Sequence, residues 1–171
     1  PHRVVSTTAK VDPQSISKRP CFLCEGNLDP EERGVPFNDY TIYCNPFPIV
    51  DRHLTIVHRE HQIQHIEGEG GNMLDIAQAL PGYFVIYNGP QCGASAPDHL
   101  HFQACSREIY PIERDTLGFP GPIVPHYARR VFLLRGAEST RLGAELLALI
   151  DILAQVSPNP VEPMLNIATL Y

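Results

Sequence analysis

The chain has 171 residues, of which 43% are hydrophobic and 19% are charged, and its formal net charge is -6. This composition is close to the globular average and excludes a disordered chain, and the length indicates one globular domain spanning residues 1–171. The negative charge excludes a broad nucleic-acid-binding surface, although a small phosphate pocket built from main-chain amides stays open. No apolar run approaches the roughly 20 residues that a membrane helix needs.

The cysteines and the first residues bear on the cellular compartment. Five cysteines at scattered spacing are typical of a reducing compartment rather than of a disulfide framework. The N-terminal residues carry no apolar core of a signal peptide, so we expect a soluble, cytoplasmic protein. The chain begins without Met and stops at Tyr171 within a strand-like stretch, which is consistent with a piece of a longer protein.

The expected elements are mostly short strands, with two helices among them. Clusters of β-branched and aromatic residues predict strands at 40–44, 53–58, 83–87, 99–104, 131–134 and 164–170. One helix is expected to begin at an Asn72 cap and to run to Leu80, and a longer one to follow a Ser139 cap. Residues 112–126 contain three prolines and predict a long loop. This order favours an α+β fold, an antiparallel sheet with flanking helices.

The most informative segment for chemistry is 98–104, with the sequence Asp-His-Leu-His-Phe-Gln-Ala. Alternate side chains of a strand share a face, so His99, His101 and Gln103 are expected to project together. The other face, expected in the core, holds Leu100, Phe102 and Ala104. An unprotonated imidazole can attack phosphorus, and a neighbouring amide can donate hydrogen bonds to the charged oxygens that develop.

A loop rich in glycine and proline, residues 88–97, directly precedes this segment. Glycine lets main-chain amides approach an anion closely, and Asn88 and Ser95 offer side-chain hydrogen bonds. Taken alone, the loop is compatible with an ordinary turn, and two histidines on a strand are compatible with a structural role. The direct succession of strand, glycine-rich loop and histidine row favours a phosphate site.

These residues resemble the histidine-triad superfamily, in the branch of galactose-1-phosphate uridylyltransferase, diadenosine tetraphosphate phosphorylase and the GDP-hexose phosphorylases. The resemblance rests on Asn88, on Gly93-Ala94-Ser95 and on His99-Leu100-His101-Phe102-Gln103. A second match is Asn45-Pro46-Phe47-Pro48, followed by the histidine-containing segment 53–61. Together the matches cover roughly residues 20–105, whereas the second, related half of those transferases is little represented here.

The resemblance implies a ping-pong nucleotidyl transfer from a nucleotide sugar or dinucleotide to phosphate or a sugar phosphate. His101 would attack the α-phosphorus and become covalently nucleotidylated. Gln103 stands where the hydrolase branch has a third histidine. In this superfamily the glutamine at that position marks transfer rather than hydrolysis. The implied phosphate contacts are Asn88, Gly93, Ser95 and Gln103, and the implied base or ribose contacts are Asn45 and Phe47.

A metal site is suggested by Cys21 and Cys24, because two thiolates at this spacing can chelate one tetrahedral zinc ion. A redox pair and two ordinary cysteines are the alternatives. In some galactose-1-phosphate uridylyltransferases such a pair joins two histidines, and the resemblance implies His61 and His99 as the remaining ligands of a structural zinc. His58 and His65 replace them if the register differs.

Two other classes of function stay open. The first is a hydrolase of dinucleotides or nucleotide sugars, against which Gln103 speaks. The second is a zinc-stabilised nucleotide-binding module without turnover. The sequence names neither the base, the sugar nor the acceptor, and a homodimer stays open because edge strands in this superfamily often pair between subunits.

Overall fold

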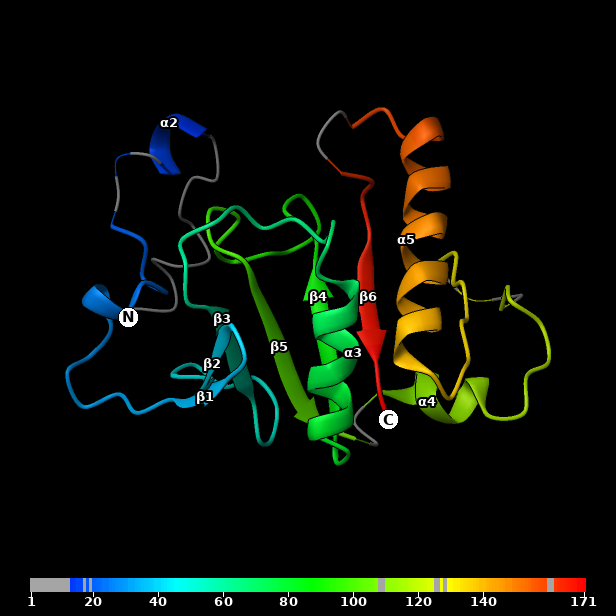
Figure 1. Cartoon of the computed structure of the whole chain (residues 1–171), viewed down its shortest axis with the longest axis horizontal. Helices are drawn as coiled ribbons and strands as arrows, with labels where there is room; N and C mark the ends of the chain where they lie inside the picture. Colours follow the sequence, from blue (N-terminus) through cyan, green and yellow to red (C-terminus); the bar gives the residue numbers. More distant parts are fainter. Residues whose placement is uncertain are drawn as a thin grey trace.

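The computed structural model describes residues 13–16, 18, 20–107, 110–124, 127, 129–159 and 162–171. Within these residues the strands form one six-stranded sheet in the order β1-β2-β3-β5-β4-β6, and every neighbouring pair is antiparallel (Figure 1). The strands are β1 (Val35–Phe37), β2 (Tyr40–Cys44), β3 (Leu54–His58), β4 (Tyr83–Asn88), β5 (His101–Ser106) and β6 (Asn166–Thr169). The predicted α+β fold around an antiparallel sheet is confirmed.

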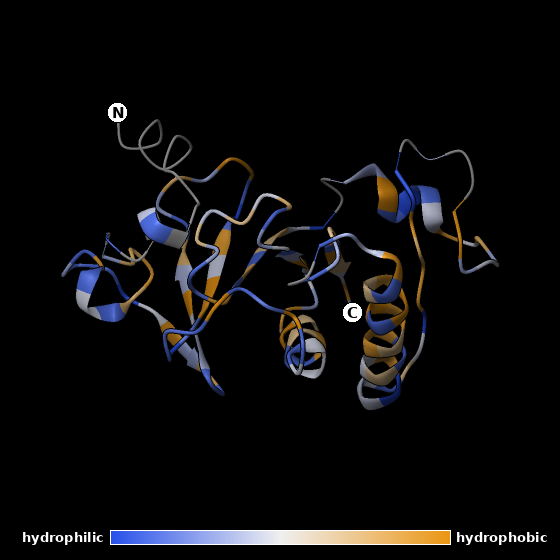
Figure 2. Ribbon diagram, turned by 90° about the horizontal axis from the view of Figure 1, so that it is seen from above, coloured by the Kyte–Doolittle hydropathy of each residue, from blue (hydrophilic) through white to orange (hydrophobic). Residues whose placement is uncertain are grey.

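Two helices cover one face of this sheet. Figure 2 shows α3 (Gly70–Ala79) and α5 (Ser139–Val156) together on the same side of the strands. The other described helices are α2 (Pro13–Ile16), the 3-10 helix η1 (Glu25–Asn27) and α4 (Pro111–Thr116). Of the helices described, none combines the length and the apolarity that crossing a bilayer requires.

The hydrophobic core lies between the two covering helices and the sheet. Helix α3 contributes Met73, Ile76 and Ala77, which recur at helical spacing and are buried. Alternate residues of β5 face them, so Phe102 and Ala104 are buried in this core. The remaining core residues are Tyr40, Ile56, Ile66, Val85, Tyr87, Leu100 and Ile150.

Strand β5 is central in the sheet, with β3 on one side and β4 on the other. Its register places Gln103 between Thr55 of β3 and Ile86 of β4, and it places His101 beside Val57. Because Phe102 and Ala104 face the helices, His101 and Gln103 lie on the opposite face. The fold therefore puts these two polar side chains in the middle of the sheet face that α3 and α5 do not cover.

Two expected elements of the C-terminal third differ from the structure. The strand predicted at 131–134 is wrong, because this segment forms an isolated bridge between Ile123 and Phe132, and β6 occupies the place beside β4. The long loop predicted over 112–126 is wrong at its start, where α4 occupies Pro111–Thr116. Proline suits the first turn of a helix, since its missing N–H is not needed there.

Both predicted helix caps are wrong. Helix α3 begins two residues before Asn72, with Glu69 at the cap position, and the Asn72 amide donates to the Glu69 carboxylate at 2.8 Å. Helix α5 begins at Ser139 itself, so Glu138 stands at its cap position without a side-chain cap. Strand β5 also begins two residues later than predicted, so His99 precedes the strand rather than sharing its face with His101.

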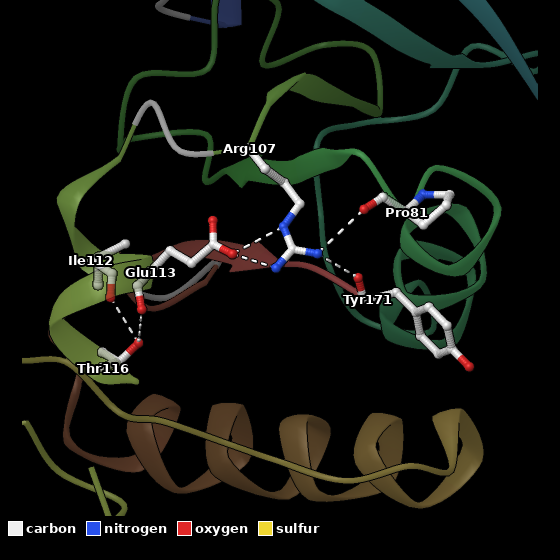
Figure 3. Close-up of polar contacts among 6 residues, drawn as sticks. All are labelled: Pro81, Arg107, Ile112, Glu113, Thr116 and Tyr171. Atoms are coloured by element: carbon white, nitrogen blue, oxygen red, sulfur yellow. Dashed lines mark hydrogen bonds and ion pairs between the residues drawn. The ribbon is translucent and has the colours of Figure 1, made fainter. Parts of the chain in front are cut away.

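The far end of β5 is fastened by Arg107 (Figure 3). Its Nε donates to Glu113 Oε1 at 3.0 Å, and Nη2 of the same guanidinium makes a second, close contact with that oxygen. Its Nη1 donates to the main-chain oxygens of Tyr171, at 3.0 Å, and Pro81, at 3.4 Å. One side chain thus joins the end of β5 to α4, to the loop before β4 and to the segment after β6.

Candidate functional site

Four side chains from three distant segments meet beside the start of β5. Cys21 and Cys24 come from the loop before η1, His61 follows β3, and His99 precedes β5. Their ligand atoms all lie within 4.8 Å of one another. Cys21 Sγ is 3.2 Å from His99 Nδ1, and Cys24 Sγ is 3.1 Å from His61 Nδ1 and 3.6 Å from His99 Nδ1. The structure thus brings together the four residues that the resemblance implies as metal ligands.

The donor set of this cluster fits zinc. Zinc bonds of about 2.3 Å to sulfur and about 2.0 Å to nitrogen place tetrahedral ligands roughly 3.5 Å apart, close to the measured separations. His99 Nε2 lies 2.7 Å from the main-chain oxygen of His58, which can only accept, so Nε2 carries the proton. The Nδ1 lone pair of His99 consequently faces both sulfurs, as a metal ligand requires.

The two alternative histidines lie elsewhere. His58 Nδ1 is 3.1 Å from the main-chain nitrogen of Glu60, and its ring packs edge-on against Tyr40 at a centroid distance of 5.1 Å. His65 Nε2 lies 3.9 Å from a carboxylate oxygen of Glu162. The structure therefore favours His61 over both alternatives as a member of the cluster.

His101 is held as a neutral imidazole with one defined tautomer. Its Nδ1 lies 2.8 Å from the main-chain oxygen of His99, so Nδ1 donates and Nε2 keeps its lone pair. Burial lowers the pKa of His101, which is 2% exposed, and the same hydrogen bond opposes this effect only in part. A neutral ring with a free Nε2 lone pair is the form in which an imidazole acts as a nucleophile.

Gln103 is oriented by a histidine that the sequence analysis did not assign. The main-chain N–H of Ile49 donates to His53 Nδ1 at 3.4 Å, so Nε2 of His53 carries the proton and donates to Gln103 Oε1 at 3.0 Å. This leaves the amide N–H groups of Gln103 to point away from His53. The pairing of Thr55 with Gln103 brings this histidine close, and that pairing is not visible in the sequence.

Asn45 and Phe47 follow β2, and β3 lies between β2 and the strand β5 that carries Gln103. The Asn45 amide donates to Thr55 Oγ1 at 2.9 Å, and its oxygen accepts from the main-chain N–H of Phe47 at 2.9 Å. Thr55 is the residue of β3 that pairs with Gln103. Phe47 is 45% exposed.

The glycine-rich loop begins where β4 ends and is anchored to the segment around β6. Asn88 Oδ1 accepts from Asn166 Nδ2 at 2.7 Å, a contact that the sequence analysis missed. A Cβ at Gly89 would come within 2.8 Å of the Leu165 oxygen, so only glycine fits there without a shift. Gly93 has φ 96°, which favours glycine, and Ser95 is exposed. Continuing the register of β4 and β5 brings Asn88 opposite His101.

Comparisons with known proteins agree with this fold. A galactose-1-phosphate uridylyltransferase of Streptococcus salivarius is 30% identical over an alignment of 91 residues, and the match covers 49% of this chain and 18% of that protein. The crystal structure of yeast Ap4A phosphorylase Apa2 matches 78% of this chain and 54% of its own, with a TM-score of 0.52 and 18% identity. The chain thus spans about half of the phosphorylase and less than a fifth of the transferase.

The resemblance to the branch of galactose-1-phosphate uridylyltransferase and Ap4A phosphorylase is therefore confirmed. A family described as "Domain of unknown function (DUF4922)" matches residues 1–106, and this match covers the candidate metal cluster, the glycine-rich loop and the histidine segment. The chain belongs to the DUF4922 family.

Proposed function

We propose that this chain transfers a nucleotidyl group through His101, from a nucleotide sugar or dinucleotide to phosphate or a sugar phosphate. One observation carries the proposal, namely the 2.8 Å contact between His101 Nδ1 and the main-chain oxygen of His99. That contact, in a buried site that lowers the pKa of His101, supports an unprotonated Nε2 poised for attack. The names of the two relatives support the same class of reaction.

The proposed reaction has two steps. In the first, the Nε2 lone pair of His101 forms a bond to the α-phosphorus, and the bond from phosphorus to the leaving oxygen breaks. The leaving group departs with that electron pair. In the second, an oxygen of the acceptor forms a bond to phosphorus, the P–N bond breaks, and its electron pair restores the neutral imidazole.

Two groups would stabilise charge on the transferred phosphoryl group. The amide of Gln103 is held by His53 through its oxygen, so its N–H groups are free to donate to a phosphoryl oxygen. The loop of Asn88, Gly93 and Ser95 starts beside His101 and would contribute main-chain and side-chain donors. Asn45 and Phe47, beside Thr55, would contact the base or ribose.

The cluster of Cys21, Cys24, His61 and His99 would hold a structural zinc ion. Zinc there would supply cross-linking and charge neutralisation for two thiolates, with no contact to substrate. Burial, and next the neighbouring Cys21 thiol, raises the pKa of Cys24, as expected for thiols that would repel each other as anions. We further propose that residues 1–171 act as one nucleotidyltransferase domain.

A nucleotide-binding module without turnover is the second candidate. His101 is only 2% exposed, so a bound nucleotide would have little access to its imidazole. In that case nucleotides would bind without any reaction at His101. A hydrolase would release a nucleoside monophosphate whether or not phosphate is present, whereas phosphorolysis would release a nucleoside diphosphate.

The decisive experiment is intact-mass spectrometry after mixing with UDP-glucose, GDP-mannose or diadenosine tetraphosphate. The reaction is quenched in denaturant at alkaline pH, because the P–N bond of a phosphohistidine is labile in acid. We expect an adduct of one nucleotidyl group in the wild type and none in His101→Asn, with the folded state of both checked by circular dichroism. An adduct that persists in His101→Asn, or substrates that bind and stay unconsumed, would overturn the proposal.

A further inference from the structure

The main chain of His101 is held by a buried side chain on the side that faces β4. Gln64, which follows β3 and is 1% exposed, accepts from the His101 main-chain N–H through Oε1 at 2.8 Å. Its Nε2 donates to the His101 main-chain oxygen at 3.0 Å and to the Asn88 main-chain oxygen at 2.9 Å. Three of the polar positions of this amide are therefore used, all with good distances.

The Gln64 amide stands where the sheet ladder would otherwise continue. The pairing of β4 with β5 ends at Ile86 and Gln103, and two residues further the ladder would join Asn88 directly to His101. The amide instead lies between these two residues and bonds to both of them. It acts as an inserted peptide group, which satisfies the His101 main chain while keeping the two strands apart.

Gln64 also contacts the other end of the glycine-rich loop. Its own main-chain N–H donates to the Pro97 oxygen at 3.1 Å. The loop 88–97 is therefore bound at its first residue by the side chain of Gln64 and near its last residue by the main chain of Gln64. The same residue is bonded to His101, so the loop and the histidine share one support.

We propose that Gln64 is a positioning residue, which fixes His101 relative to both ends of the loop 88–97. This rests on the proposed function, in which the His101 imidazole and the loop bind the same phosphoryl group. Displacing reacting groups by about 1 Å can lower a rate about 100-fold, so the hydrogen bonds of this amide matter for reactivity even though the side chain touches no substrate.

The test separates this role from a general loss of stability. Gln64→Met keeps the volume of the side chain and removes every hydrogen bond of the amide. Gln64→Glu keeps the acceptor for the His101 N–H but turns an oxygen toward two main-chain oxygens. Tyr87→Phe is the matched control, because it likewise removes buried hydrogen bonding, here from a hydroxyl that lies 2.9 Å from Glu162 Oε1. That hydroxyl bonds to neither His101 nor the loop 88–97.

The measurement is the single-turnover rate of adduct formation as a function of nucleotide concentration. The rate is expressed per folded molecule, and the zinc content of each variant is determined. We expect Gln64→Met to lower the limiting rate about 10- to 100-fold and to change the half-saturating concentration less than about threefold. We expect Gln64→Glu to lower the limiting rate as well, and we expect the limiting rate of Tyr87→Phe to stay within about twofold of the wild-type rate.

Each contrary outcome points to one cause. If Gln64→Met and Gln64→Glu react as fast as Tyr87→Phe per folded molecule, or if only the half-saturating concentration changes, the positioning role is wrong while the proposed function stands. If Gln64→Met does not fold, Gln64→Glu alone decides by the same comparison. If the wild type itself forms no adduct, the proposed function fails and the positioning role fails with it.

Discussion

The main-chain oxygen of His99 accepts the hydrogen bond of His101 Nδ1 at 2.8 Å, while the imidazole of His99 lies in the cluster with both cysteines. One residue thus belongs to the candidate metal centre through its side chain and to the candidate nucleophile through its peptide oxygen. A change at the metal centre is expected to reach His101 through a single peptide unit.

Removal of the metal is the first prediction. We expect the purified protein to hold one equivalent of zinc. We expect Cys21→Ser to lose this zinc, because a serine hydroxyl is a poor replacement for one of the two thiolate ligands. Loss of a structural metal costs about 4 kcal/mol or more, which lowers the Tm by roughly 10 °C for a chain of this size. Elemental analysis and thermal unfolding measure both effects. Cys44→Ser, an exposed thiol outside the cluster, is the control, and an unchanged Tm after zinc loss would contradict a structural role.

The second prediction concerns the contact between His53 and Gln103. His53→Phe removes the donor that holds Gln103 Oε1, so the amide can rotate away from the phosphoryl oxygens. We expect adduct formation to slow about 10-fold, as for the loss of one hydrogen bond to a charged group. We also expect the effect to be absent in a Gln103→Ala background, because the two residues act through one contact. Fully additive rates in the double variant would argue against this orientation role.

The third prediction is a pH dependence of stability at Glu162. Burial raises the pKa of this carboxyl group, although hydrogen bonds from the Ile66 N–H and the Tyr87 hydroxyl and the charge of His65 oppose the rise. Because the folded pKa exceeds the unfolded one, this group stabilises the fold fully below the unfolded pKa and loses that contribution as pH rises through the folded pKa. The substitution Glu162→Gln should therefore raise the stability of the fold most at neutral pH.

The measurement is the difference in Tm between Glu162→Gln and the wild type from pH 4 to pH 8. We expect this difference to increase with pH, since a one-unit difference in pKa corresponds to about 1.4 kcal/mol, or roughly 3–6 °C in Tm. Tyr87 and Cys92 also face the carboxylate, and His65 Nε2 lies 3.9 Å away, so the series is repeated in a His65→Gln background. Glu31→Gln, at an exposed position far along the chain from His65, is the control, and a difference that falls with pH would refute the assignment.

The fourth prediction concerns the Arg107 contacts of Figure 3. Arg107→Met leaves the carboxylate of Glu113, which is largely buried, without its guanidinium and removes two bonds to main-chain oxygens. We expect a loss of about 2 kcal/mol in the free energy of unfolding, measured in urea. Arg141→Met breaks an exposed ion pair with Glu145 and is expected to change stability by less than about 0.5 kcal/mol. Equal effects of the two variants would show that the Arg107 contacts add nothing.

Much of the sheet could be predicted from local patterns. The alternation around Phe102 and the β-branched residues of 54–58 identify buried strands without knowledge of their partners. The short strand β1 and the helix at Pro111 carry weak local signals, so they were not predicted. The predicted start of α3 was also wrong, because Glu69 at its cap position is held by Tyr40, which is 29 residues earlier in the chain.

The candidate site divides in the same way. Residue types and spacing indicate the polar row of His99, His101 and Gln103 and the Cys-X-X-Cys pair, and the family resemblance adds the choice of His101 as the nucleophile. His53 and Gln64 escape such reasoning, because each acts on β5 from a segment that is 37 to 50 residues earlier in the chain. Their roles follow from strand pairing and from a break in a ladder, and neither leaves a pattern in the sequence.

The central place of β5 has a consequence for how the protein becomes active. Because this strand pairs with β3 and β4 at once, His101 acquires its surroundings only after segments on both sides have docked. A nascent or partly unfolded chain would carry a solvated, ordinary imidazole. Reactivity toward a nucleotide would then arise together with the last long-range strand pairing. The fraction of chains that carry the nucleotidyl adduct would therefore report the fraction of correctly folded molecules in a sample.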